Sequence, residues 1–134
     1  MKFVAVVKKA LEPRVDQRGA LYEVYRRDTD GFEARQVYFS TSKPEVIRGN
    51  HYHMRKVESF SVIRGKARLF LVDVEGGQRT ETILDAERPE LVIIRPGTAH
   101  AIQPLGPETM ILLILVSEEF RPEDSDTTPY QVIG

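Results

Sequence analysis

The chain has 134 residues, and its hydrophobic content of 41% and charged content of 29% are typical of a soluble globular domain. A formal net charge of -1 provides no basic field that would attract nucleic acid or an anionic membrane surface. Because the chain has no cysteine, disulfides, thiolate metal sites and a cysteine nucleophile are excluded.

Short apolar stretches, separated by turn residues, follow one another along the whole chain. Such runs, bounded by Gly, Pro and Asp, predict β-strands. We expect strands over residues 2–7, 21–25, 34–39, 59–63, 66–74, 79–84, 90–95 and 109–117. In the run 66–74, Ala67, Leu69 and Leu71 alternate with Arg68 and Phe70, so one face of this strand is apolar. The pattern predicts an all-β sandwich or barrel and a single domain over residues 1–134.

The ends of the chain and its longest apolar run indicate a cytoplasmic protein without a membrane partner. The apolar residues 3–7 lie between lysines and lack a small-residue cleavage site, so we expect no signal peptide. The apolar run 110–116 is too short to cross a bilayer. The acidic tail 118–126 is expected to be a solvated surface extension, and Arg55 and Lys56 are expected to be solvated on a turn.

All three histidines of the chain fall in one constellation with a glutamate. His51 and His53 are two residues apart, so their side chains share a face only if this segment is extended. Glu58 reaches them if the chain reverses through residues 54–57 and returns on a neighbouring strand. His100 follows a Pro-Gly turn at the start of a distant strand. Because imidazoles and carboxylates are common metal ligands, the spacing predicts a metal site in a β-barrel.

These residues match both motifs of the cupin superfamily, which the chain resembles. The first motif runs from Gly49 to Gly65, and the second is Pro-Gly-Thr-Ala-His at 96–100. The resemblance implies a double-stranded β-helix, a jelly-roll barrel, with a divalent metal at its mouth. The implied ligands are His51, His53, Glu58 and His100. Zinc is the expected ion, and iron, manganese and nickel are alternatives because the same donors also hold them.

A narrower resemblance is to enzymes that act on nucleotide sugars. Residues 35–42 and 46–52, with the upstream segment 16–19, are similar to the dTDP-4-dehydrorhamnose 3,5-epimerases. Residues 35–127 resemble more closely the C-terminal cupin domain of bifunctional capsular-polysaccharide enzymes, which epimerise and then reduce a UDP-4-keto-6-deoxy-sugar. The resemblance implies an isomerase, an epimerase of a nucleotide-linked 4-keto-6-deoxy-hexose in cell-surface polysaccharide biosynthesis. The Gly-rich dinucleotide fingerprint of the reductase half is not found in this sequence.

Epimerisation next to a ketone requires a base, an acid and a group that stabilises the enolate oxygen. In the rhamnose-pathway epimerases, the histidine that matches His51 is the base and no metal is needed. This chain departs from their pattern in two places, because their glutamine is His53 here and their acidic tyrosine aligns near Leu113. Both changes favour a metal cupin in which His51 is either the base or a ligand. The candidate proton donors are then Tyr38, Tyr52 and Tyr130.

The expected partners are a nucleotide sugar and a second copy of the chain. The resemblance places Arg18, Gln36 and Arg48 at the substrate, and guanidinium groups match the phosphate oxygens of a nucleotide diphosphate. An apolar N-terminal strand would leave an exposed edge, so we expect it to pair with a second subunit in a homodimer. Two alternatives stay open: a metal-dependent cupin oxygenase or isomerase of another small molecule, and a non-catalytic sugar-binding module.

Overall fold

The computed structural model describes residues 6–134, and almost all regular structure in this range is β-strand. The strands are β1 (Val6–Ala10), β2 (Pro13–Asp16), β3 (Gly19–Tyr22), β4 (Gln36–Ser42), β5 (Arg48–Tyr52), β6 (Glu58–Arg64), β7 (Lys66–Asp73), β8 (Arg79–Asp85), β9 (Glu90–Ile94), β10 (Thr98–Leu105), β11 (Met110–Val116) and β12 (Thr128–Pro129). A short 3-10 helix, η1, covers Pro122–Asp124. No helix in this range is long and apolar enough to cross a membrane.

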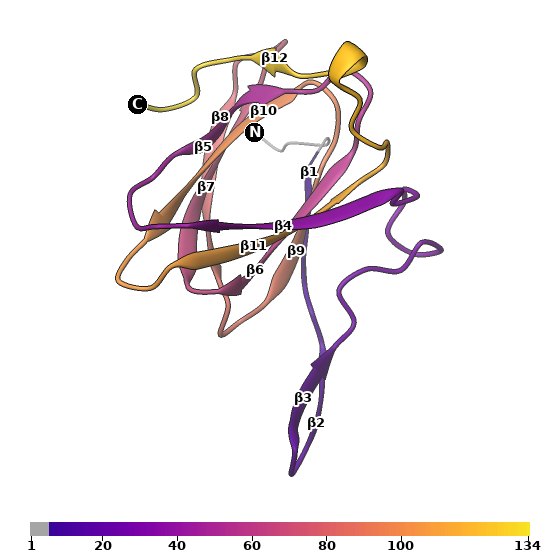
Figure 1. Ribbon diagram of the computed structural model, residues 1–134, viewed down its shortest axis with the longest axis vertical. Helices are drawn as coiled ribbons and strands as arrows, with labels where there is room; N and C mark the ends of the chain where they lie inside the picture. The colour runs from indigo at the N-terminus through magenta and orange to yellow at the C-terminus, as the bar shows by residue number, and fades with distance from the viewer. Residues whose placement is uncertain (1–5) are drawn as a thin grey trace.

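Two five-stranded antiparallel sheets form the body of the described chain (Figure 1). One sheet has the order β1-β9-β6-β11-β4, and the other has the order β12-β5-β10-β7-β8. From β4 to β11 the chain crosses between the two sheets at every connection except the hairpin between β7 and β8. This is the double-stranded β-helix that the cupin motifs predict, and the fold prediction is confirmed.

Alternate residues of both sheets fill the space between them. On β7, Ala67, Leu69 and Leu71 are at most 2% exposed, which confirms the apolar face predicted from their alternation. They belong to one cluster with Leu112 and Ile114 of β11, which lies in the facing sheet. Burial of this apolar surface contributes roughly 25 cal/mol per Å² and holds the two sheets together.

Agreement between predicted and observed strands is best in the middle of the chain. The predicted strands 59–63, 66–74, 79–84, 90–95 and 109–117 match β6, β7, β8, β9 and β11 to within one residue at either end. The predicted strands 21–25 and 34–39 are shifted against β3 and β4. Most of the predicted strand 2–7 lies outside the described residues.

A two-stranded hairpin of β2 and β3 projects from the body (Figure 1). Its side chains Val15 and Leu21 are 72% and 65% exposed. The connection after the hairpin turns back onto the outer face of the first sheet, where Phe32 packs with Ile93 and Leu115. The hairpin itself is therefore exposed, whereas the connection that follows it covers part of the outer face of the first sheet.

The chain after β11 returns across one end of the barrel (Figure 1). Through η1 it reaches β12, which pairs with His51 and Tyr52 of β5. Val132 is then buried against Val72 and Ala99. Residues 118–126 lie on the surface and residues 119–124 are exposed, as predicted for a solvated extension. The segment is not loose, however, because hydrogen bonds tie it to the turn 54–57.

Candidate metal centre and active site

Strand β5 carries His51 into the interior of the barrel. Its path depends on two residues in the left-handed region, Gly49 with φ of 99° and Asn50 with φ of 56°. A Cβ atom at position 49 would lie 2.7 Å from the backbone oxygen of His100, so only glycine allows β5 and β10 to approach this closely. In the resulting register, His51 is opposite His100.

His53 and Glu58 lie on either side of the turn that follows β5. His53 comes directly after the strand, and its carbonyl oxygen accepts a hydrogen bond from the N–H of Gly97 at 2.9 Å. Glu58 is the first residue of β6, which belongs to the other sheet. The prediction that Glu58 returns on a neighbouring strand is therefore wrong, because the chain crosses between the sheets at this turn.

The structure brings the four predicted ligand residues together at one end of the barrel interior. One ligand atom from each of His51, His53, Glu58 and His100 lies within 4.8 Å of the others. Oε1 of Glu58 is 2.9 Å from Nε2 of His53 and 3.1 Å from Nε2 of His100. His53, Glu58 and His100 are buried, whereas His51 is partly exposed, so a small molecule would reach the cluster on the His51 side.

The electrostatics of the cluster keep the glutamate charged and His51 neutral. Burial by itself would raise the pKa of Glu58, but the two neighbouring imidazoles, His100 and His53, outweigh it and hold this pKa well below its usual range. Burial would lower the pKa of His53, and the Glu58 carboxylate reverses that effect and raises it. Burial, together with the charges of His100 and His53, lowers the pKa of His51 to about 4. At neutral pH His51 is therefore a neutral imidazole, the form that binds metals and accepts protons.

The donor set fits a divalent metal ion. Within residues 6–134, the buried Nε2 of His100 has no aligned hydrogen-bond partner, and a buried polar atom in this state costs about 1–3 kcal/mol. Nδ1 of His100 faces the carbonyl oxygen of Thr98 at 3.2 Å, and Nδ1 of His53 faces that of Asp126 at 2.7 Å. Nδ1 of each ring is thus the donor, which leaves Nε2 directed at the cluster. Three imidazoles and one carboxylate could hold zinc, iron, manganese or nickel.

A cavity of about 200 Å³ opens beside the cluster. Besides His51, Glu58 and His100, its walls are formed by Tyr38, Ser40, Arg48, Gly49, Phe60, Ile102, Leu112 and Ile114. A larger hollow of about 450 Å³ lies at the other end of the barrel, beside the turn at Gly65 and the turn at Pro107, and no histidine lines it. We therefore assign the chemistry to the smaller cavity.

Tyr38 is the candidate proton donor that lines this cavity. Burial and the nearby negative charge of Glu58 raise the pKa of Tyr38 to about 12, so its hydroxyl keeps its proton at neutral pH. Tyr52 follows His51 on β5 and therefore faces the opposite side of the sheet. There it packs edge-on against Tyr130, with ring centroids 6.1 Å apart. Neither Tyr52 nor Tyr130 lines the cavity, so the geometry favours Tyr38 among the three candidate proton donors.

The three residues expected at the substrate have different surroundings. Arg48 lines the cavity, and its guanidinium donates to Oγ of Ser42 at 2.6 Å and to the carbonyl oxygen of Thr41 at 3.0 Å. The side chain of Gln36 accepts a hydrogen bond from the N–H of Phe120 at 2.9 Å. Arg18 lies at the projecting hairpin, 84% exposed and paired with Asp16. The fold thus brings Arg48, and not Arg18, to the cluster of the same chain.

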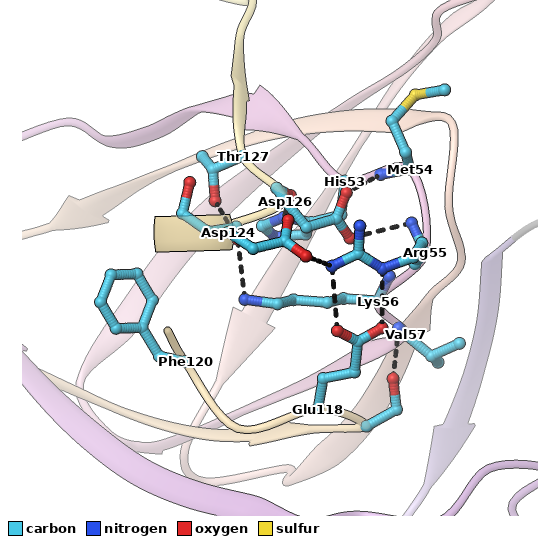
Figure 2. Close-up of polar contacts among 12 residues, drawn as sticks. His53, Met54, Arg55, Lys56, Val57, Glu118, Phe120, Asp124, Asp126 and Thr127 are labelled. Carbon is cyan, nitrogen blue, oxygen red and sulfur yellow. Dashed lines mark hydrogen bonds and ion pairs between the residues drawn. The ribbon is translucent and has the colours of Figure 1, made fainter. Parts of the chain in front are cut away.

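Sequence reasoning missed the contacts that the tail makes behind the cluster (Figure 2). Lys56 is only 5% exposed and donates to the carbonyl oxygen of Ser125 at 2.8 Å, so the prediction that it is solvated is wrong. Arg55 is paired with Glu118 and Asp124. Asp126 bonds to three backbone N–H groups of the turn. The clustering of acidic residues in the tail was the signal that could have indicated a partner for these two cations.

Comparison with known families finds a match to the polysaccharide biosynthesis C-terminal domain, over residues 14–128. Over 112 residues the chain is 35% identical to a UDP-2-acetamido-2,6-beta-L-arabino-hexul-4-ose reductase of Pseudomonas aeruginosa. This match covers 84% of the chain but only 29% of that reductase. Over 124 residues it is 30% identical to Agl13 of Haloferax volcanii, a probable low-salt glycan biosynthesis epimerase, with 87% of the chain and 80% of Agl13 covered.

A solved structure with a similar fold is ChmJ, a 3'-monoepimerase from Streptomyces bikiniensis, as a double mutant in complex with dTDP. It superposes with a TM-score of 0.84 at 22% identity, covering 96% of the chain and 70% of ChmJ. This likeness confirms the jelly-roll cupin fold. The resemblance to polysaccharide-biosynthesis proteins is confirmed by the family match and by the reductase.

Proposed function

We propose that this chain, which belongs to the polysaccharide biosynthesis C-terminal domain family, is a metal-binding epimerase of a nucleotide-linked 4-keto-6-deoxy-hexose. One observation carries the proposal: a neutral His51 and a protonated Tyr38 line the same small cavity as Glu58 and His100, whose ligand atoms cluster with that of His53. A base, an acid and an electrophilic site are the groups that epimerisation beside a ketone needs.

The proposed chemistry is a proton exchange at the carbon next to the ketone. The hydrogens at C3 and C5 of a 4-keto sugar are acidified by the carbonyl group. His51 is the most exposed imidazole of the cluster, and its lowered pKa keeps it unprotonated at neutral pH. It is therefore the residue best placed to accept the proton, and Tyr38 is the residue best placed to return one from the cavity wall.

The metal would be held by His53, Glu58 and His100, with His51 as a fourth ligand if it is not the base. A divalent ion bound there supplies Lewis-acid polarisation of a carbonyl oxygen. Zinc is the ion we propose, because imidazole and carboxylate donors in this number are a zinc set, with iron, manganese and nickel as alternatives. The buried Glu58 carboxylate offsets one of the two positive charges of such an ion.

The size of the cavity suggests how a substrate is divided over the site. At about 200 Å³ the cavity is smaller than the roughly 300–1,000 Å³ usual for small-molecule sites, so it would take the sugar and leave the nucleotide outside. Arg48 lies at the wall of this cavity, with its guanidinium fixed by Ser42 and Thr41. We propose that Arg48 binds the diphosphate that joins the sugar to the nucleotide.

The relatives support the substrate class. The Pseudomonas protein is named for a UDP-linked hexul-4-ose, and the Haloferax protein is named a probable epimerase of glycan biosynthesis. The solved ChmJ structure contains dTDP. The chain spans less than a third of the reductase. The step that we propose for the cavity described above is the epimerisation.

Two other functions remain as outcomes of the test. The same donors hold iron in cupin oxygenases, so metal-dependent oxygen consumption would indicate that class. Binding of the sugar nucleotide without turnover would indicate a non-catalytic sugar-binding module.

Solvent exchange tests the proposal directly. In D₂O, the protein is expected to introduce deuterium at C3 or C5 of a UDP- or dTDP-4-keto-6-deoxy-hexose. NMR spectra of the sugar measure this uptake. His51→Gln is expected to abolish the uptake. Tyr52→Phe, which removes a hydroxyl from the opposite face of the same strand, is expected to leave it unchanged.

Metal content of His51→Gln separates the two roles of His51. If the variant keeps its metal, His51 is the base, and if the metal is lost, His51 is a ligand. Deuterium uptake at the wild-type rate in His51→Gln would contradict the epimerase mechanism.

A further inference from the structure

The C-terminal strap, residues 118–133, crosses the end of the barrel next to the cluster of His51, His53, Glu58 and His100. Figure 2 shows how Asp126 of this strap lies against the turn between His53 and Glu58. The two carboxylate oxygens of Asp126 accept hydrogen bonds from the consecutive backbone N–H groups of Met54, Arg55 and Lys56, each at 2.9 Å. One side chain thus accepts the hydrogen bonds of three backbone N–H groups in the turn that joins the two ligand residues, His53 and Glu58.

The backbone of Asp126 contacts a ligand itself. Its carbonyl oxygen accepts a hydrogen bond from Nδ1 of His53 at 2.7 Å. A carbonyl oxygen is only an acceptor, so Nδ1 carries the proton and Nε2 is the nitrogen that faces Glu58. Asp126 has a φ of 52°, a conformation that aims its side chain at the turn and its carbonyl at the imidazole.

Further contacts hold the strap on both sides of Asp126. On one side, Lys56 is buried and donates to the carbonyl of Ser125, and Arg55 bridges Glu118 and Asp124. On the other side, Oδ1 of Asn50 accepts from the N–H groups of Val132 and Ile133 at 2.9 and 3.1 Å. The strap is therefore fastened both before His51 and after His53.

We propose that Asp126 is a positioning residue for the metal site: it fixes the turn 54–57 and holds His53 with Nε2 directed at the cluster. This inference rests on the metal site of the proposed function, and it gives the C-terminal strap a role in that site. Groups that hold a metal-ligating histidine through its second nitrogen change metal affinity by about 10–100-fold when they are removed.

Three variants in the full chain test this role, with Zn²⁺ alone as the probe in competition with a chromophoric chelator. Asp126→Gly permits the positive φ and keeps the backbone carbonyl, but it removes the carboxylate that fastens residue 126 to the turn. The carbonyl is then no longer held against Nδ1 of His53, so Zn²⁺ binding is expected to weaken by about 10–100-fold. Asp126→Asn keeps one acceptor and is expected to lie between Asp126→Gly and the wild type. Asp124→Asn removes an exposed ion pair of the same strap and is expected to stay within about twofold of the wild type.

A second measurement does not depend on metal. In the metal-free protein, the Nδ1 proton of His53 is expected to exchange slowly with solvent in NMR spectra, and Asp126→Gly is expected to speed this exchange while Asp124→Asn leaves it unchanged. Equal Zn²⁺ affinity in Asp126→Gly and the wild type, or an Nδ1 proton equally protected in both, would overturn the inference. A wild type that binds no Zn²⁺ would contradict the metal site itself, and the Nδ1 proton would still decide the role of Asp126.

Discussion

At the scale of residues, the cluster combines one charged carboxylate with two imidazoles, His51 and His53, whose pKa values are shifted in opposite directions. Burial and the neighbouring histidines lower the pKa of His51, whereas Glu58 raises the pKa of His53. Chemically identical side chains therefore receive different roles from their positions. His53 and His100 are deep and fixed through Nδ1, which is typical of ligands, and His51 is the member that solvent reaches.

Metal analysis tests the ligand set. Protein purified without chelator is expected to carry close to one divalent ion per chain. His53→Ala and His100→Ala each remove a donor from the cluster, so they are expected to lose most of the bound metal. Elemental analysis of the purified proteins measures this.

Glu108→Gln is the matched control, because Glu108 is an exposed carboxylate at the other end of the barrel. It is expected to keep full occupancy. Full occupancy in both histidine variants, or no metal in the wild type, would show that the ligand assignment is wrong.

At the scale of elements, the close approach of β5 and β10 sets the geometry of the site. The ladder between them has an irregularity at His100 and Ala101, next to Gly49. Irregular strand pairing of this kind re-aims side chains. Here it places His51 and His100 with ring centroids 4.8 Å apart and their planes perpendicular.

A substitution at Gly49 tests this contact. Gly49→Ala combines a φ of 99° with a clash against the backbone oxygen of His100, so it is expected to lower the free energy of unfolding by about 2–3 kcal/mol. Urea denaturation of the metal-free protein measures the change. Metal occupancy is expected to fall as well, because the clash displaces two ligand-bearing strands.

Gly77→Ala provides the comparison. Gly77 has a φ of 78°, but a Cβ atom there would meet nothing within 4 Å, so only the backbone strain of about 1 kcal/mol is expected. If the two substitutions cost the same, the close approach at Gly49 does not constrain the site.

At the scale of the whole molecule, β1 and β4 form the two ends of one sheet, as described for residues 6–134. On β4, Val37 and Phe39 are 62% and 66% exposed. Exposed sheet edges and apolar faces favour association. The single domain over residues 1–134 and the homodimer both stay predictions.

We expect a homodimer in which the N-terminal strand pairs with a second subunit. Light scattering at micromolar concentration measures the mass. Deletion of residues 1–7 is expected to convert the dimer to a monomer, because it removes the strand that would be exchanged.

Phe39→Ser tests whether the dimer is formed through β4 instead of the N-terminal strand. A dimer that survives the deletion but dissociates in Phe39→Ser would be formed through β4, and a wild-type monomer would rule out strand exchange.

The amino-acid sequence alone was sufficient to predict the fold class, most central strands and the four residues of the cluster. These features are local: alternation along a strand specifies its buried face, and two histidines separated by one residue converge only on an extended chain. Within residues 59–117, the predicted bounds of β6, β7, β8, β9 and β11 agree to within one residue, whereas the strand that carries His100, β10, was expected without bounds.

The sheet that carries each ligand residue, and the contacts that support it, could be read only from the folded chain. Glu58 faces the histidines from the opposite sheet, Tyr52 points away from the cluster, and the acidic tail holds His53 through Asp126. Each of these facts depends on contacts between segments distant in the chain, such as the one between residues 53 and 126. Local periodicity carries no information about such contacts, because it specifies which face is buried but not what lies against it.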